Sequence, residues 1–145
     1  MVKRESLGWS QRAERQLRAA TLRFEIGTLE FLLGEALDDL ELLAELGELY
    51  TRAGEYEKGL WVDRRLVELA PENPVSHYNL ACSHALLGQI DAAFAALERA
   101  IANGYQDCEH LEHDRDLGAL RGDPRYQALC ARLRSNPADS EPPGS

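Results

Sequence analysis

Histidine, cysteine and aspartate side chains lie close together in sequence near the C-terminal end of the chain. The set is Cys108, His110, His113 and Asp114. These are ligand types for zinc, which binds three or four such groups at about 2.0–2.3 Å. The spacing therefore raises a metal site as a hypothesis, which holds only if the fold turns these side chains towards one point.

A second set has the residue types of nucleophilic catalysis. Ser76 and Ser83 share a segment with His77 and His84, and Cys82 precedes His84 by two residues. The sequence has no Gly-x-Ser-x-Gly elbow and no glycine-rich phosphate loop. On a helix, residues two apart do not face each other. We predict that Cys82 is a small interface residue and assign no catalytic residue.

These residues lie in a segment that repeats itself. Residues 40–71, shifted forward by 34 positions, fall on residues 74–105 with matching side chains. The matched pairs are Leu46 and Leu80, Gly47 and Ala81, Gly54 and Gly88, Tyr56 and Ile90, Gly59 and Ala93, Leu60 and Phe94, and Val67 and Ile101. A period of about 34 residues is typical of stacked helical hairpins, which bind partners far more often than they catalyse reactions. The same offset gives His77 and His84 the packing positions of Leu43 and Tyr50.

Helix signals predict an all-α fold, a short right-handed α–α superhelix. Apolar periodicity and turn residues predict four hairpin helices, over residues 39–52, 56–69, 74–87 and 90–102. After them, Asp116 is expected to cap a short helix over 117–121, and Asp123-Pro124 to start one over 125–134. This last block would cover the open end of the array, as a terminal repeat must.

The N-terminal segment predicts a long helix over residues 10–33, or two helices with a bend near Gly27. Ser10 is its expected N-cap and Gly34 its expected end. Its buried stripe is expected to consist of Ala13, Leu17, Ala20, Phe24 and Phe31, widened by Leu22, Leu29, Leu32 and Leu33.

The two hairpins resemble tetratricopeptide repeats. The resemblance rests on small residues at Gly47/Ala81 and Gly59/Ala93, turn glycines at Gly54/Gly88, and Pro71 after the first hairpin. Residues 103–133 resemble the end-of-group segment that terminates many bacterial proteins of this kind. Its matching pieces are Gly104-Tyr105, Leu111, Asp114, Asp116-Leu117, Leu120-Arg121 and Asp123-Pro124-Arg125-Tyr126, with Arg115 often proline and Tyr126 often phenylalanine in that pattern. The resemblance implies an interaction module without cofactors or catalytic residues, and it explains Leu111 and Asp114 without a metal.

The chain is thus divided into an N-terminal basic helix or partial repeat (1–37), two hairpins (38–72 and 73–104), an end cap (105–134) and a tail (135–145). The tail has three prolines and no large apolar side chain, so we expect disorder. Three cysteines argue against a disulfide scaffold. A reducing cytoplasm is therefore the expected location. We expect no membrane span, because no run approaches 18 apolar residues.

The predicted concave surface is formed by the first helix of each hairpin. One helix face offers Glu41, Ala44, Glu45, Glu48 and Thr51, and the next offers Val75, Tyr78, Asn79, Cys82 and Ala85. Two interpretations remain open: a groove for a basic or neutral peptide or protein, or glutamates that merely solvate an exposed face. Some tetratricopeptide domains hold a chaperone C-terminal carboxylate with lysine, asparagine and arginine. Asn79 fits such a clamp, but Ala44 and Glu48 do not, and the glutamates would repel a carboxylate.

Charge distribution supplies an alternative function. The net charge is −9, yet residues 1–23 hold six basic and two acidic residues. The acidic body argues against nucleic-acid binding. Basic side chains at Arg12, Arg15, Arg18 and Arg23 would contact an acidic partner or a second copy, giving a homodimer. A non-catalytic adaptor is therefore the predicted function, and an oligomerisation or regulatory subunit acting through its N-terminal helix is the alternative.

Overall fold

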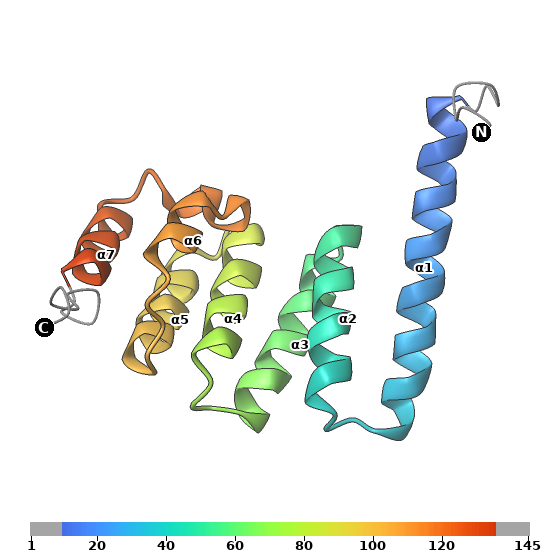
Figure 1. Ribbon diagram of the computed structural model, residues 1–145, viewed down its shortest axis with the longest axis horizontal. Coiled ribbons are helices and arrows are strands. Elements are labelled where there is room, and N and C mark those ends of the chain that lie inside the picture. Colours follow the sequence, from blue (N-terminus) through green and yellow to red (C-terminus); the bar gives the residue numbers. More distant parts are fainter. Residues whose placement is uncertain (1–9, 136–145) are drawn as a thin grey trace, which may run out of the picture.

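Helices stacked side by side make up the computed structural model, which describes residues 10–135 (Figure 1). The elements are α1 (Gln11–Glu35), α2 (Leu40–Ala53), α3 (Tyr56–Leu69), α4 (Pro74–Leu86), α5 (Ile90–Ala102), α6 (Cys108–His113), the 3₁₀ helix η2 (Arg115–Leu120) and α7 (Pro124–Arg134). Within residues 10–135 the regular structure is entirely helical, and none of these helices is long and apolar enough to span a membrane. The expected tail lies outside the described residues, apart from Ser135.

Tight turns join the two helices of each hairpin. Gly54 and Gly88 have φ angles of 75° and 71°, in the left-handed region that glycine enters without steric cost. At the start of α2 the Asp39 side chain accepts hydrogen bonds from the Glu41 and Leu42 amides. Asn73 caps α4 in the same way, and Pro74 takes the first helical position, where an amide donor is not needed. The predicted bounds of α3 and α5 are confirmed.

Two apolar clusters hold the stack together. One joins α1, α2 and α3 around the buried residues Leu43, Leu46 and Val62. The other joins α4 and α5 to the C-terminal segments around Leu97, Leu111 and Leu117. His77 and His84 are buried, as the 34-residue offset predicted, with His77 Nε2 2.7 Å from the Pro71 carbonyl oxygen. Helices α1 to α5 therefore pack mainly on their neighbours in sequence, whereas η2 packs on α4.

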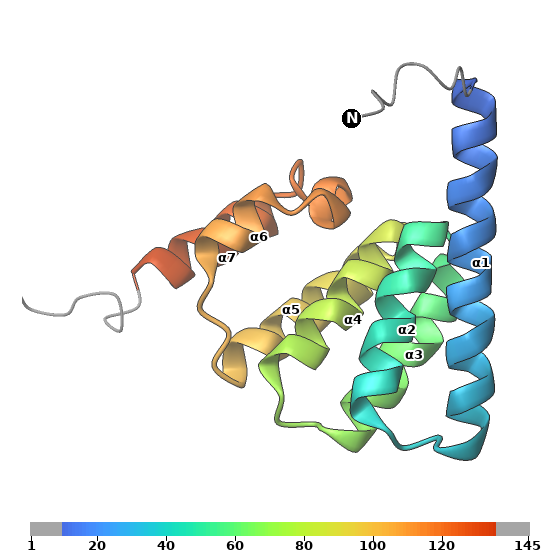
Figure 2. The ribbon, with the colours of Figure 1, turned by 45° about the vertical axis from the view of Figure 1, so that its right-hand side comes forward.

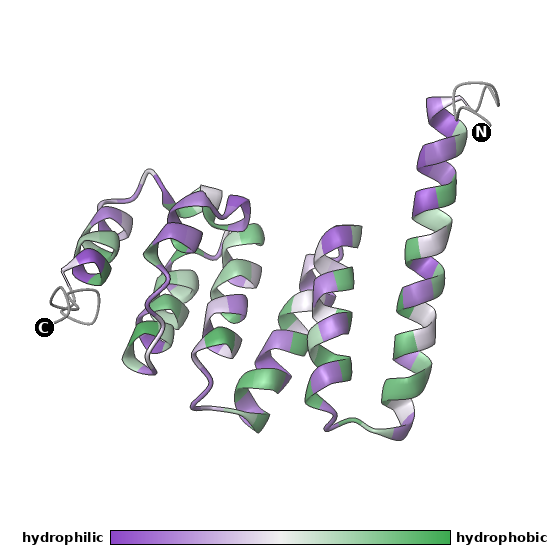
Figure 3. Cartoon of the chain, in the orientation of Figure 1, coloured by the Kyte–Doolittle hydropathy of each residue, from purple (hydrophilic) through white to green (hydrophobic). Residues whose placement is uncertain are grey.

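The N-terminal helix is continuous through Gly27 and begins at the predicted N-cap, Ser10. Its buried face, however, is only the widening part of the predicted stripe, Leu22, Leu29 and Leu33, joined by Ile26. Ile26 and Leu33 are buried on α2 and α3, whereas Phe24 and Phe31 are 75% and 74% exposed. The reason is that α1 carries apolar residues on two opposite sides, and only one side meets the array. Figure 3 shows apolar residues recurring along α1, including the part that extends past the end of α2.

The segment after α5, hereafter the cap, consists of α6, η2 and α7. The short helix α6 is an addition to the predicted elements. The 3₁₀ helix η2 starts at Arg115 rather than Leu117, and its N-cap is Asp114, not Asp116, because Asp114 accepts a hydrogen bond from the Asp116 amide. The predicted N-cap of α7 is confirmed, because Asp123 accepts from the Arg125 amide. Figure 2 shows the cap at the far end of the molecule from α1.

Candidate functional site

A groove of about 700 Å³ lies between α2, α4 and the start of the cap. All six predicted concave-face residues line it: Glu41, Glu45, Glu48, Tyr78, Asn79 and Cys82. The cap adds His110, Asp114 and Asp116, and α3 adds Asp63. The lining thus holds six carboxylates and one imidazole. Charge of one sign in a concave surface concentrates the field and attracts cations.

One wall of the groove is the exposed face of α2. Glu41, Glu45 and Glu48 follow at spacings of four and three residues, so they stand on one side of the helix. All three are exposed, while Leu43 and Leu46 on the other side are buried. The amphipathic pattern of α2 therefore fixes the direction of these glutamates.

The opposite wall differs from the sequence-based prediction at Tyr78. Its ring is only 3% exposed and stacks on Tyr105, with ring centroids 4.5 Å apart and planes 11° from parallel. Its hydroxyl donates a hydrogen bond of 2.7 Å to Asp114. Tyr78 is thus used to attach the cap and offers little surface to a ligand. Asn79 is partly buried and remains the amide that lines this wall.

The thiol of Cys82 lies in the same contact. Cys82 is 8% exposed, and its Sγ is 3.7 Å from Asp114 Oδ2. Burial, followed by the charge of Asp114, raises the pKa of Cys82, so the thiol stays protonated at neutral pH. A protonated thiol is a poor nucleophile, which agrees with the predicted interface role.

The four residues considered for metal binding are not brought together. Cys108 Sγ is 3.4 Å from Glu112, and His113 Nδ1 is 2.8 Å from the Glu109 carbonyl oxygen. Only His110 and Asp114 approach each other, at 3.5 Å. A different set comes closer: one ligand atom each from Cys82, Asp114 and Asp116 lie within 4.8 Å of one another. Tyr78 and the Asp116 amide already donate hydrogen bonds to Asp114.

Asp63 also lines the groove, although the sequence pattern did not predict it there. It is 6% exposed and accepts a hydrogen bond of 2.5 Å from the Ser83 hydroxyl. Burial raises its pKa to about 6, and the hydrogen bond from Ser83 opposes this shift. The repeat offset contained a signal for it, because Asp63 falls on the apolar Leu97 of the second hairpin.

The four arginines predicted to make electrostatic contacts lie away from the groove. Arg12, Arg15, Arg18 and Arg23 are all exposed on α1. None of them lines the groove among the described residues. They belong to a separate surface.

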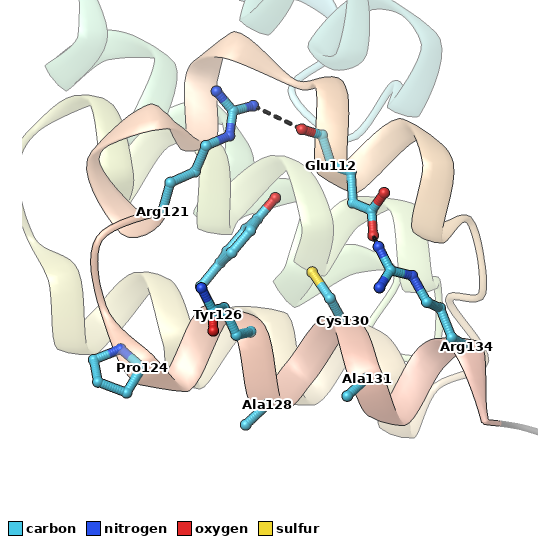
Figure 4. A pocket seen from close by; sticks show the side chains of 9 residues that line it. Glu112, Arg121, Pro124, Tyr126, Ala128, Cys130, Ala131 and Arg134 are labelled. Atoms are coloured by element: carbon cyan, nitrogen blue, oxygen red, sulfur yellow. Dashed lines mark hydrogen bonds and ion pairs between the residues drawn. The ribbon is translucent and has the colours of Figure 1, made fainter.

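A second hollow, of about 820 Å³, lies on the cap (Figure 4). Its polar groups are used within the protein. Arg121 donates hydrogen bonds to the carbonyl oxygens of Glu112 and Asp114, and Tyr126 donates one to that of Leu111. Arg134 pairs with the Glu112 carboxylate. These contacts pack α7 on α6, and we do not assign a ligand to this hollow.

Solved structures with a similar fold identify the architecture. The described chain superposes on MamA with a TM-score of 0.64 at 17% identity, covering 88% of this chain and 72% of MamA. A second structure, MamA MSR-1 C2, gives 0.61 at 16% identity, covering 81% and 70%. MamA is a tetratricopeptide-repeat protein. The fold is tetratricopeptide-like. The prediction from the repeat offset is therefore confirmed.

Sequence comparison adds one curated relative. No protein-family model matches the chain. A chloroplastic protein of Arabidopsis thaliana is 33% identical over 90 residues, or 60% of this chain. The chain spans about a quarter of the length of that relative, 27%. The match therefore covers part of this chain and part of a larger protein.

Proposed function

We propose that this chain is a non-catalytic adaptor that binds a basic or neutral peptide, or a protein segment of that character, in the groove between α2, α4 and the cap. The observation that carries the proposal is the lining of six carboxylates around one open groove. Clustered like charges on a concave wall favour a cationic occupant and speed its association. The tetratricopeptide-like fold supports a protein-interaction role in general terms.

The contacts of the groove suggest a division of roles. Glu41, Glu45 and Glu48 are exposed and free to approach lysine or arginine side chains of an extended peptide. Asn79 would bond the peptide backbone through its amide, which can both donate and accept. Tyr78 and Asp114, which are bonded to each other, hold the opposite wall in place.

The proposal is tested by neutralising the α2 wall. The triple variant Glu41→Gln, Glu45→Gln, Glu48→Gln keeps the shape of each side chain and removes three charges. We expect it to bind a pool of lysine- and arginine-rich dodecapeptides at least tenfold more weakly, with a shallower dependence of affinity on salt. Fluorescence anisotropy at several salt concentrations measures both.

The matched control removes three charges elsewhere. Glu35, Glu57 and Glu72 are exposed and lie outside the groove lining, so their replacement by glutamine keeps the net charge equal to that of the test variant. If both triple variants lose affinity equally, net charge rather than the groove binds the peptides, and the proposal is wrong.

A further inference from the structure

A second apolar stripe runs along the side of α1 that faces away from the array. It consists of Leu17, Phe24 and Phe31, which are 55%, 75% and 74% exposed. They are spaced seven residues apart, so they fall nearly on one line of the helix. Isolated exposed apolar residues are normal on protein surfaces, but two phenylalanines and a leucine in register form one apolar row.

Small residues occupy the alternate positions of the same stripe. They are Ala13, Ala20, Gly27 and Gly34. A Cβ atom built at Gly27 or Gly34 would meet nothing within 4 Å. The stripe therefore alternates large side chains with open spaces, in the a and d positions of a heptad. Such a face is complementary to itself: when two copies run antiparallel with Phe24 over Gly27 of the second copy, Phe31 lies over Ala20 and Leu17 over Gly34.

Charges along α1 distinguish the two possible directions of pairing. The N-terminal half carries four basic residues and one acid: Arg12, Arg15, Arg18, Arg23 and Glu14. The C-terminal half carries acids only: Glu25, Glu30 and Glu35. Parallel helices would place like charges beside each other, whereas antiparallel helices place the basic half of one beside the acidic half of the other. Charge therefore favours the antiparallel pair.

Among residues 10–135, little packs on the N-terminal half of α1. Figures 1 and 2 both show α1 extending well past the end of α2. From Gln11 to Thr21 only Ala13 is even partly buried. A helical segment without tertiary packing is marginally stable in water. Contact with another helix would supply the missing packing.

We propose that α1 pairs with α1 of a second copy of this chain, as an antiparallel homodimer held by the stripe of Leu17, Phe24 and Phe31. The basic residues of each copy lie beside the acidic half of the other. The groove is on a different surface, so the proposed dimer does not depend on the proposed adaptor function.

Molecular mass tests the dimer. By sedimentation equilibrium at 50 µM the full chain should have twice its 16.2 kDa mass. Phe24→Glu should weaken association at least a hundredfold. Gly27→Leu should do the same by filling the space meant for Phe24 of the second copy, and it improves helix propensity, so unfolding cannot explain its effect.

The control is Trp61→Glu on α3, which charges an aromatic side chain that is 55% exposed and lies outside the stripe. It should leave the dimer intact, with circular dichroism confirming the helix content of every variant. A wild-type chain that remains monomeric at 50 µM overturns the proposal. So does a dimer that survives both Phe24→Glu and Gly27→Leu.

Cross-linking tests the direction of pairing. In a Cys108→Ser background, Leu17→Cys and Gly34→Cys chains are oxidised separately and as a mixture. The antiparallel pair predicts a disulfide-linked dimer only in the mixture, because residue 17 of one copy lies beside residue 34 of the other. Efficient cross-linking of either variant alone would indicate parallel helices and overturn the antiparallel arrangement.

Discussion

Asp63 places a carboxylate where the second hairpin has the fully buried Leu97. Its partner is the Ser83 hydroxyl, and burial raises its pKa to about 6. An acid whose pKa is higher in the folded state holds its proton more tightly there. Its contribution to stability is therefore greatest at acidic pH and is lost as the pH rises through 6. Ionised Asp63 therefore stabilises the folded protein less than protonated Asp63 does.

Replacing Asp63 with asparagine should remove this pH dependence. Between pH 5 and 7.5 a shift of this size costs the wild-type chain about 1.4 kcal/mol of unfolding free energy, which Asp63→Asn should not lose. Urea denaturation at both pH values measures the difference. Glu57→Gln, on the exposed side of the same helix, is the control and should follow the wild type. Equal pH slopes for Asp63→Asn and the wild type would contradict the assignment.

Helix α3 and the turn before it use glycine for different reasons. Gly59 lies inside α3 where the second hairpin has Ala93, and a Cβ atom there would meet its nearest neighbours at an ordinary 3.7 Å. Gly54 has a φ of 75°, which a residue with a side chain adopts only with strain. The same glycine-to-alanine change should therefore have opposite effects at these two positions.

We expect Gly59→Ala to raise the unfolding free energy by about 0.5–1 kcal/mol, because alanine is the better helix former and has room. Gly54→Ala should lower it by roughly 1–2 kcal/mol, because the turn requires the left-handed conformation. Thermal and urea unfolding of the two variants measure the sign of each change in unfolding free energy. Destabilisation by Gly59→Ala would mean that α2, α3 and α4 pack more tightly there than the distances indicate.

The four hairpin helices α2 to α5 could be predicted from the repeat offset, because the turn glycines and apolar positions recur with it. The face of α1 that packs on the array could not be predicted in this way. Leu17, Phe24 and Phe31 form as regular a stripe as Leu22, Ile26, Leu29 and Leu33, and periodicity alone does not say which stripe meets the array. The cap was harder still, since α6 and η2 are short and their hydrogen bonds depend on Asp114 rather than on apolar spacing.

The candidate site could be predicted in part for similar reasons. The α2 glutamates followed from helical geometry alone. The burial of Tyr78 did not, because Tyr105 and Asp114 reach it from a segment whose position depends on tertiary packing. Asp116 and His110 line the groove for the same reason. Residues contributed by the next element in the stack are those that a single repeat cannot reveal.

At the scale of the whole molecule, the groove and the outer stripe of α1 are separate surfaces with different chemistry. One is lined by carboxylates, and the other is apolar. If each is used as proposed, a dimer presents two grooves that act independently for short ligands.

We therefore expect Phe24→Glu to leave the affinity for a basic dodecapeptide unchanged within twofold, with one peptide bound per chain in both the wild type and the variant. Isothermal titration calorimetry gives the affinity and the stoichiometry together. Half a peptide per chain in the wild type, rising to one in Phe24→Glu, would mean that the two surfaces overlap in the dimer.

The Asp114 contact has a consequence for local unfolding. Helical arrays open most readily at their ends, where each segment has only one neighbour. The cap is such an end, yet Asp114 both starts η2 and binds Tyr78 of α4. When the cap frays, the groove loses a wall, and an occupant that requires this wall opposes the fraying. If the groove binds a ligand as proposed, its occupancy governs how often the C-terminal end of the array opens to solvent.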